Sequence, residues 1–214
     1  MKHTIIQCAQ GSDSPEWIAA RLGRVTGSIA DILFAQGKTK GTESTQRINL
    51  RYALAEERIT GQAKAFEFVS KAMKHGTEQE PYARMAYEGE RDECVIQTGF
   101  IRCEDVMAGC SLDGHIAQAG RIVGINEIKC PMLKTHIFYW KAGTLPADYR
   151  WQVAHNLLCT DAEWCDFISY RPGFRLFVLR VHARDLPLEE YQVALTKFLK
   201  EVDECEAEIR SYAA

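Results

Sequence analysis

The sequence predicts a domain that combines helices with a mixed β-sheet, of the α/β or α+β class. Amphipathic helical patterns run from residue 14 to about residue 88, short β-like segments follow up to residue 130, and both patterns then alternate to the end of the chain. With 214 residues, the chain has enough material for a sizeable hydrophobic core. No repeat, low-complexity tract or linker interrupts it, so we expect residues 1–214 to form one domain.

The first two helices are predicted from their start signals. Ser14 and Pro15 make a favourable N-cap and first-turn pair for a short helix. Thr26 or Ser28 can cap a second helix in the segment "TGSIADILFA". A basic loop, "AQGKTKGTES", separates this helix from the next one.

Two longer helical patterns complete the N-terminal part. The segment "TQRINLRYALAEERITG" is amphipathic and ends at Gly61, a residue suited to the left-handed conformation that closes many helices. A further helical pattern covers residues 68–88. Here we expect a break near Gly76 and a new helix start before Pro81, because glycine and proline disfavour a helix interior.

Short β-like segments follow, separated by turn residues such as Asp113-Gly114 and Ala119-Gly120. The first three expected strands lie in "CVIQTGFIRC", "VMAGCSLDGHI" and "RIVGINEIKC". After them we expect helices at residues 132–141 and 146–159, strands in "WCDFISYRP" and "RLFVLRVHA", and a long helix from residue 186 to residue 212.

The composition is that of an ordinary globular protein, with 46% hydrophobic and 26% charged residues. No apolar run reaches the roughly 20 residues of a membrane span, and the N-terminus lacks a signal-peptide core, so we expect a cytoplasmic protein without membrane association. The eight cysteines are then reduced thiols, and without a C-x-x-C pair a zinc ribbon is not expected. A net charge of −3 neither supports nor excludes nucleic-acid binding.

The most informative segment is "GINEIKCP", residues 124–131. It carries Glu127 and Lys129 two positions apart, so that in a strand both side chains point to the same face. Such a pair is often exposed to solvent, and burying it is costly unless the charges are paired or bind a ligand. The neighbouring side chains are apolar and favour a central, buried strand: Ile122, Val123, Ile125 and Ile128.

Asp113, in "SLDG", gives this strand a chemical context. Thirteen residues separate it from Glu127, and a hairpin between the two strands would bring both carboxylates together. Two converging carboxylates repel each other unless they share a cation, and hard oxygen ligands favour Mg²⁺ or Mn²⁺. Lys129 could position or deprotonate a water molecule, or neutralise a developing negative charge. The set suits metal-assisted hydrolysis of a phosphodiester.

Other polar residues are candidates for binding phosphate. Arg21 can form a two-pronged contact with an anion, and Ser28 lies where a helix N-terminus is expected; the alternative for Arg21 is a surface ion pair. Lys38 and Lys40 can contact a DNA backbone, or can simply belong to a solvated loop. His115 has no second histidine at ligand spacing, so we do not expect a zinc site.

The pattern D-x13-E-x-K resembles the core of the PD-(D/E)xK nucleases, although Leu112 replaces the common proline before the aspartate. Five blocks between residues 15 and 170 resemble, in order and spacing, the lambda-exonuclease-like (YqaJ-type) viral recombinase family of that superfamily. The blocks are "WIAARLGRVTGS", "KAMKHGTEQEPYAR", "GCSLDG", "NEIKCP" and "YRWQVAHNLL". The resemblance implies a restriction-endonuclease-like core, with a mixed β-sheet flanked by helices.

The resemblance also implies roles for residues outside the strand. Glu80 matches an acidic residue that completes the active site from a helix, and Gln152 matches a glutamine beside the metal. Arg21 and Ser28 match residues that receive the terminal 5′-phosphate of the degraded strand. Met73 matches an apolar residue that wedges between the two strands. By residue type alone, Glu80 could be an exposed helical glutamate, Gln152 a polar position on an amphipathic helix and Met73 core filler.

The function implied by the resemblance is that of a Mg²⁺-dependent deoxyribonuclease, with Mn²⁺ as a substitute. Such an enzyme degrades double-stranded DNA from 5′ to 3′ in phage-type recombination, releasing mononucleotides and leaving a 3′ single-stranded overhang. Asp113, Glu127 and the backbone carbonyl of Ile128 would hold the metal, and Lys129 would activate water. The family also implies a homotrimeric ring around DNA and a single-strand annealing protein as partner.

Two alternatives remain open on the sequence. An endonuclease or a 3′-to-5′ exonuclease would share the same core, and only a pocket formed by Arg21 and Ser28 would distinguish them from a 5′-to-3′ enzyme. A relative that binds DNA without cleaving it is the second alternative. The complete acidic and basic set argues against it: Glu80, Asp113, Glu127 and Lys129.

Overall fold

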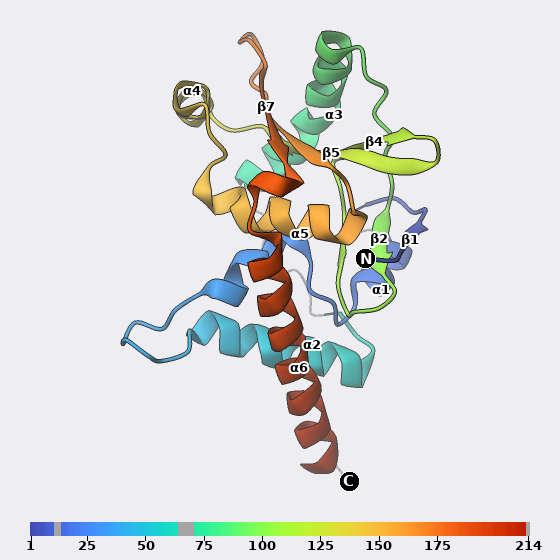
Figure 1. Cartoon of the computed structure of the whole chain (residues 1–214), viewed down its shortest axis with the longest axis vertical. Helices are drawn as coiled ribbons and strands as arrows, with labels where there is room; N and C mark the ends of the chain where they lie inside the picture. The colour runs from blue at the N-terminus through green and yellow to red at the C-terminus, as the bar shows by residue number, and fades with distance from the viewer. Residues whose placement is uncertain (11–13, 64–70, 213–214) are drawn as a thin grey trace.

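The computed structural model describes residues 1–10, 14–63 and 71–212 (Figure 1). A four-stranded sheet lies at its centre, with strand order β4-β5-β6-β7. β5 and β6 are parallel and the other two pairs are antiparallel, so the sheet is mixed, as the sequence predicts. The strands are β4 (Gly114–Gln118), β5 (Arg121–Lys129), β6 (Trp164–Ser169) and β7 (Phe177–His182).

A second, three-stranded antiparallel sheet contains a strand that the sequence analysis missed. It consists of β1 (His3–Ile6), β2 (Phe100–Cys103) and β3 (Gly109–Cys110). β1 pairs with β2 along its whole length, from His3 opposite Cys103 to Ile6 opposite Phe100. The apolar run in β1 is short, and its conformation depends on this pairing with a segment almost 100 residues away.

Helices cover both faces of the four-stranded sheet. α3 packs on one face, where Ala83 and Tyr87 join a buried cluster with Trp164. α5 lies against the other face, where Val153 and Leu157 belong to the largest core cluster. The α-helices are α1 (Pro15–Arg21), α2 (Thr45–Thr60), α3 (Lys71–Arg91), α4 (Leu133–Ala142), α5 (Arg150–Thr160) and α6 (Leu188–Tyr212), and the 3₁₀ helices are η1 (Gly27–Phe34), η2 (Ala147–Tyr149) and η3 (Ala183–Asp185).

The arrangement has two ends. α3, α4 and the β4–β7 sheet occupy one end, and α2 and α6 pack against each other at the opposite end (Figure 1). None of the helices described here is long and apolar enough to cross a membrane.

Local signals predict the helix ends well. The side-chain oxygen of Ser14 accepts a hydrogen bond from the backbone N–H of Trp17 at 3.3 Å, which caps α1. Gly61 closes α2 with a φ of 67°, in the left-handed region that favours glycine. Thr26 occupies the N-cap position of η1, but its side chain makes no capping hydrogen bond.

The predicted helix after Thr26 is present, as a 3₁₀ helix. One expectation about helices is wrong. The break near Gly76 and the new start before Pro81 do not occur, because α3 continues through both residues. A proline inside a helix removes one backbone hydrogen bond. Burial of Ala83 and Tyr87 against the sheet stabilises α3 despite this loss.

β5 is the central strand predicted from its apolar pattern. It pairs with β4 on one side and β6 on the other. Gly124 lies beneath Trp164 of β6, and a Cβ atom at this position would overlap the indole ring. The hairpin register places Gly114 opposite Asn126, so Asp113 lies at the level of Glu127. The hairpin therefore brings the two carboxylates together as the spacing predicts.

A buried ion pair joins β6, β7 and α3. Asp166 is completely buried, and Arg180 donates to its two carboxylate oxygens at 2.9 and 2.8 Å. The hydroxyl of Tyr87 donates a third hydrogen bond at 2.7 Å. The Arg180 guanidinium also lies 3.5 Å from the centre of the Trp164 ring. These three hydrogen bonds compensate the buried charge of Asp166.

We predict that Arg180→Ala destabilises the fold by about 2–3 kcal/mol, because it leaves the buried Asp166 carboxylate without its main partner. The value is at the low end for a buried pair because the Arg180 side chain is 37% exposed. Urea unfolding followed by circular dichroism measures it. Arg184→Ala is the matched control, since Arg184 lies 4.0 Å from the exposed Asp185 and should change stability by less than about 0.5 kcal/mol. Equal losses in the two variants would contradict the prediction.

Candidate active site

Asp113 and Glu127 lie at the end of the β4–β5 hairpin. The Oδ2 atom of Asp113 accepts a hydrogen bond from the backbone N–H of Ile128 at 2.6 Å. This bond fixes the aspartate carboxylate against the edge of β5. In a strand, the N–H and C=O of one residue point to the same edge, so the carbonyl of Ile128 also lies on the side of Asp113.

The Glu127 carboxylate is held by three side chains, although it is only 3% exposed. The Lys129 ammonium lies 2.5 Å from Oε1, which confirms that Glu127 and Lys129 share a face of β5. Gln152 donates to the same oxygen at 2.7 Å, and Asn156 donates to Oε2 at 3.3 Å. One strand neighbour and two α5 residues therefore fix the position of this carboxylate.

The site carries more negative charge than its cations compensate. Burial raises the pKa of Glu127 to about 7, with a further increase from Asp113, although Lys129 opposes the shift. Burial also raises the pKa of Asp113. Burial would lower the pKa of Lys129, but the charges of Glu127 and Asp113 outweigh it and raise this pKa, so the ammonium stays protonated at neutral pH.

Glu80 reaches the same site from α3. Burial and the charge of Asp113 raise its pKa to about 7. Arg84, one helical turn later, donates to Glu80 at 2.6 Å and to the backbone carbonyl of Asp113 at 3.1 Å. Arg84 thereby links the helical glutamate to the start of β4. The charges of Asp113, Glu127 and Lys129 all shift the pKa of Glu80, so the four predicted residues lie in one site.

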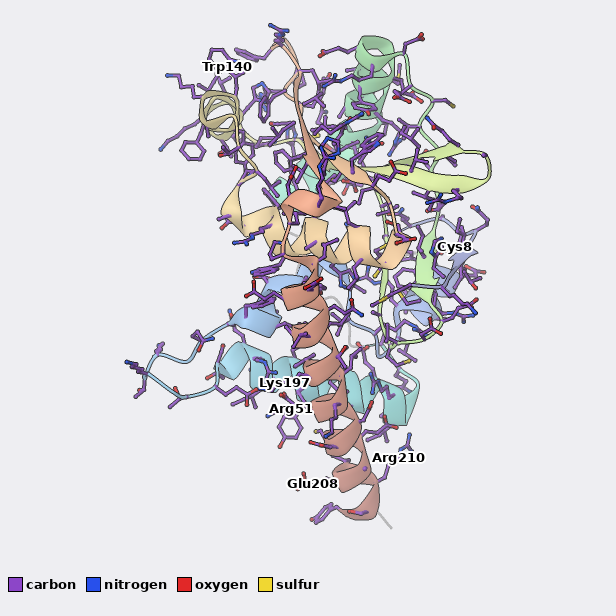
Figure 2. The ribbon with its side chains drawn as sticks, in the orientation of Figure 1. Cys8, Arg51, Trp140, Lys197, Glu208 and Arg210 are labelled. Carbon is purple, nitrogen blue, oxygen red and sulfur yellow. The ribbon has the colours of Figure 1, made fainter. Side chains whose placement is uncertain are left out.

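An open groove borders this cluster. It has a volume of about 650 Å³, and Glu80 and Arg84 form part of its wall. Cys8, labelled in Figure 2, and Trp17 belong to the opposite wall, formed by the N-terminal segment and α1. The groove thus borders the cluster on the side of Glu80 and Arg84.

A second cavity, of about 280 Å³, contains both residues expected to bind a terminal phosphate. Arg21 and Ser28 line it together with Glu57 of α2. The Arg21 guanidinium lies 4.0 Å from the centre of the Trp17 ring, and burial lowers its pKa while Glu57 raises it. Ser28 is exposed at the start of η1. The structure thus brings Arg21 and Ser28 to one cavity.

α5 connects this cavity with the carboxylate site. Gly27, next to Ser28, packs so closely on α5 that a Cβ atom there would lie 3.3 Å from Cγ of Gln152. It would also overlap the Asn156 amide. The same two α5 residues donate hydrogen bonds to Glu127, so they contact both η1 and the active-site carboxylate.

The remaining expected DNA contacts lie away from this cluster. Lys38 and Lys40 are exposed on the loop between η1 and α2, which extends away from the rest of the molecule in Figure 1. Met73 lies in the first turn of α3, and its side chain falls outside the described part of the structure.

Three functional neighbours were not found from the sequence. Asn156 follows Gln152 by four residues, and Arg84 follows Glu80 by four, so the helical i, i+4 relation could have indicated both. Tyr149, whose ring lies 4.8 Å from the Lys129 ammonium, had no sequence signal because η2 brings it there.

The donor set suits a small, hard cation. Among the residues that the structure describes, no group of three or more His, Cys, Asp or Glu side chains has the arrangement of a metal centre. Asp113, Glu127 and the Ile128 carbonyl instead offer two carboxylates and one backbone oxygen, the ligand types that Mg²⁺ prefers. Burial raises the pKa of both carboxyls, and Asp113 adds to the shift of Glu127, so a bound cation would stabilise their ionised forms. Burial raises the pKa of Cys130 to about 11, so its thiol is not a nucleophile at neutral pH.

Comparisons with known proteins identify the family of this chain. Residues 16–163 match the YqaJ-like viral recombinase domain. An alkaline exonuclease (LHK-Exo) from Laribacter hongkongensis, solved alone and in complex with dAMP, is 32% identical to this chain with a TM-score of 0.79; the match covers 92% of this chain and 97% of the exonuclease. No curated protein sequence matches significantly.

A more distant structure supports the fold alone. The phage related exonuclease from Haemophilus somnus 129PT is 15% identical, with a TM-score of 0.63 over 87% of this chain and 96% of that protein. The family match covers more than half of the 214 residues. The chain therefore belongs to the YqaJ-like viral recombinase family, with the PD-(D/E)xK-like mixed α+β fold of the alkaline exonuclease, and this kinship indicates a nuclease.

Proposed function

We propose that this nuclease is a Mg²⁺-dependent exonuclease that degrades one strand of double-stranded DNA from its 5′ end. It would release mononucleotides and leave a 3′ single-stranded overhang for recombination by strand annealing. The observation that carries the proposal is the meeting of Asp113, Glu127 and Lys129 in one buried site. A relative solved in complex with dAMP supports a deoxynucleotide as ligand.

Asp113, Glu127 and the Ile128 carbonyl are the proposed Mg²⁺ ligands, and Mn²⁺ could replace Mg²⁺. When bound, the cation would activate a water molecule and neutralise charge on the phosphate. Both carboxyls must be ionised to bind it. Lys129 favours this state, because its charge lowers the pKa of each.

Lys129 is the proposed catalytic lysine. Because its ammonium stays protonated, it can donate hydrogen bonds to a water molecule or to a phosphate oxygen and offset negative charge in the transition state. Gln152 keeps Glu127 in place, and its amide oxygen can accept a hydrogen bond from a water molecule. Glu80, held by Arg84, can orient a further water molecule at the edge of the groove.

Arg21 and Ser28 are proposed to bind the terminal 5′-phosphate. Arginine suits this task because its planar guanidinium donates two parallel hydrogen bonds to phosphate. The close packing of η1 on α5 keeps their cavity near the carboxylates. Binding a 5′-phosphate there would give the enzyme its direction.

Further residues, away from the carboxylate site, would bind the duplex DNA. Lys38 and Lys40 are proposed to contact the phosphate backbone, and Met73 to separate the two strands ahead of the cut. We also propose that the protein forms a homotrimeric ring around DNA and works with a single-strand annealing protein that binds the overhang. Enclosure of the DNA would keep the enzyme on its substrate through many cycles.

The test of activity uses a linear duplex labelled at either end and a closed circular duplex, each with Mg²⁺. We predict that the linear duplex loses nucleotides from its 5′ ends and that the circle stays intact. Lys129→Ala should reduce the rate at least about 100-fold, because a fixed positive charge at the reacting phosphate is lost, while DNA binding persists. Cutting of the circle, or loss from 3′ ends, would contradict the exonuclease proposal.

Lys200→Ala is the matched control for the lysine. Lys200 is an exposed α6 residue whose partner is Glu204, 3.8 Å away, and its removal should leave the rate unchanged. Full activity of Lys129→Ala would remove the lysine from the mechanism.

Substrates with and without a 5′-phosphate test the cavity of Arg21 and Ser28. We predict that the wild-type enzyme degrades the phosphorylated end about 10 to 100 times faster, the value of one charge-assisted contact, and that Arg21→Ala removes the difference. Arg21→Lys keeps the charge but not the planar fork, so it should restore only part of the preference. Equal rates of the wild-type enzyme on both ends would show that the cavity does not bind the phosphate.

Sedimentation equilibrium tests the proposed ring. We predict a mass three times that of the 24.2 kDa chain, at protein concentrations used for activity. A mass that stays at one chain over the whole concentration range would exclude the ring.

A further inference from the structure

An aromatic and basic surface covers α4 and the connection between β6 and β7. Phe138 is 66% exposed, Trp140 57% and Phe174 47%. Figure 2 labels Trp140 on α4, at the periphery of the molecule. We call the following residues the α4 surface: Lys134, Phe138, Trp140, Lys141, Phe174 and Arg175.

Packing against the rest of the protein does not explain the aromatic residues of this surface. α4 buries His136 and Tyr139, whereas both Phe138 and Trp140 are exposed. At 100° per residue, the exposed arc of the helix begins at Trp140, continues through the two lysines and ends at Phe138. Aromatic rings exposed on this arc do not contribute the stabilising free energy of burial. Such exposed apolar patches mark interaction sites.

The α4 surface is positively charged and free of carboxylates. No Asp or Glu occurs from Ile128 to Ala147, or from Phe167 to Arg184, in a chain with a net charge of −3. Lys134, Lys141 and Arg175 are exposed. The nearest acidic residue after α4 is Asp148, in η2. Protein interfaces are depleted of lysine, so lysines between aromatic rings favour a polyanion over a protein partner.

The two segments form one surface. The rings of His136 and Phe174 lie 6.4 Å apart, and the backbone carbonyl of Arg175 lies 3.1 Å from Nε2 of His136. Trp140 follows His136 by four residues and lies on the same side of α4. Phe174 therefore lies beside α4, next to the side of the helix that carries Trp140.

α4 lies close to the proposed active site. The Tyr139 hydroxyl lies 3.4 Å from that of Tyr149, and the Tyr149 ring lies 4.8 Å from the Lys129 ammonium. Tyr139 is buried, so these contacts show that α4 packs close to the proposed active site, within reach of a strand that leaves Lys129 over the surface. Exposed rings stack on unpaired bases but cannot reach bases inside a duplex, which favours single-stranded over double-stranded DNA.

We propose that the α4 surface binds single-stranded DNA, with Phe138, Trp140 and Phe174 stacking on bases and Lys134, Lys141 and Arg175 contacting phosphates. This inference rests on the proposed function, because the single strand is the product of the exonuclease. The surface guides that strand away from the carboxylates and keeps its bases apart from the complementary strand.

Fluorescence anisotropy with labelled oligothymidine of about 20 nucleotides, longer than the ~4–16 nucleotides that one binding module covers, measures this binding. EDTA is present, so that no cleavage occurs. We predict that Phe138→Ala with Trp140→Ala weakens binding about tenfold, because two stacking platforms are lost. Phe138→Tyr with Trp140→Phe should retain the affinity. Tyr212→Ala is the matched control, an exposed ring in the last turn of α6. The C-terminal end of α6 lies at the opposite end of the molecule from α4 (Figure 1).

The salt dependence tests the basic part of the surface. Lys134→Gln with Lys141→Gln should lower the slope of log affinity against log salt by about 1.4, or about 0.7 for each phosphate contact. Lys200→Gln should leave the slope unchanged. Unchanged affinity in the aromatic variant would overturn the inference. A change of its sedimenting mass would overturn it too, since the surface would then join copies of the chain.

The outcome is independent of the test of activity. If the wild-type protein degrades linear duplexes but the aromatic variant binds oligothymidine normally, the α4 inference fails and the proposed function stands. If the wild-type protein degrades no DNA but the variant loses oligothymidine affinity, the surface stands and the exonuclease proposal fails.

Discussion

The buried Glu127 carboxylate is the constraint on which the rest of the structure depends. Lys129 favours its ionised form, and two α5 amides fix its position, so β5 and α5 must lie at a fixed separation. The parallel pairing of β5 and β6 requires a crossover, and α5 is the last part of that crossover. The strand order thus brings a helix with polar side chains across the end of the strand that carries the charge.

Asp166 and Glu127 are buried carboxylates on adjacent strands, but they differ in how well nearby cations compensate their charge. Asp166 on β6 accepts three hydrogen bonds from Arg180 and Tyr87, and the Arg180 charge compensates its own. Glu127 on β5 shares its surroundings with Asp113 and Glu80, and Lys129 and Arg84 do not balance three carboxylates. Asp166 therefore stabilises the sheet, whereas the surroundings of Glu127 favour a further cation.

The sequence predicts the parts of this site that depend on local spacing. A hairpin of known register places Asp113 beside Glu127, and strand alternation places Lys129 on the same face. The contact of Gln152 depends on where the crossover returns, so only the family resemblance indicated it. β1 and the unbroken α3 were missed for the same reason, because distant packing partners stabilise both against weak or unfavourable local preferences.

The contact between Gly27 and α5 has a consequence for the size of the product. No side chain fits between η1 and the two amides that hold Glu127, so this packing fixes the distance between the phosphate cavity and the carboxylates. In the proposed exonuclease, the distance from the bound end to the broken bond is the length of what is released. The number of nucleotides removed per cycle is then a property of one helix packing on another.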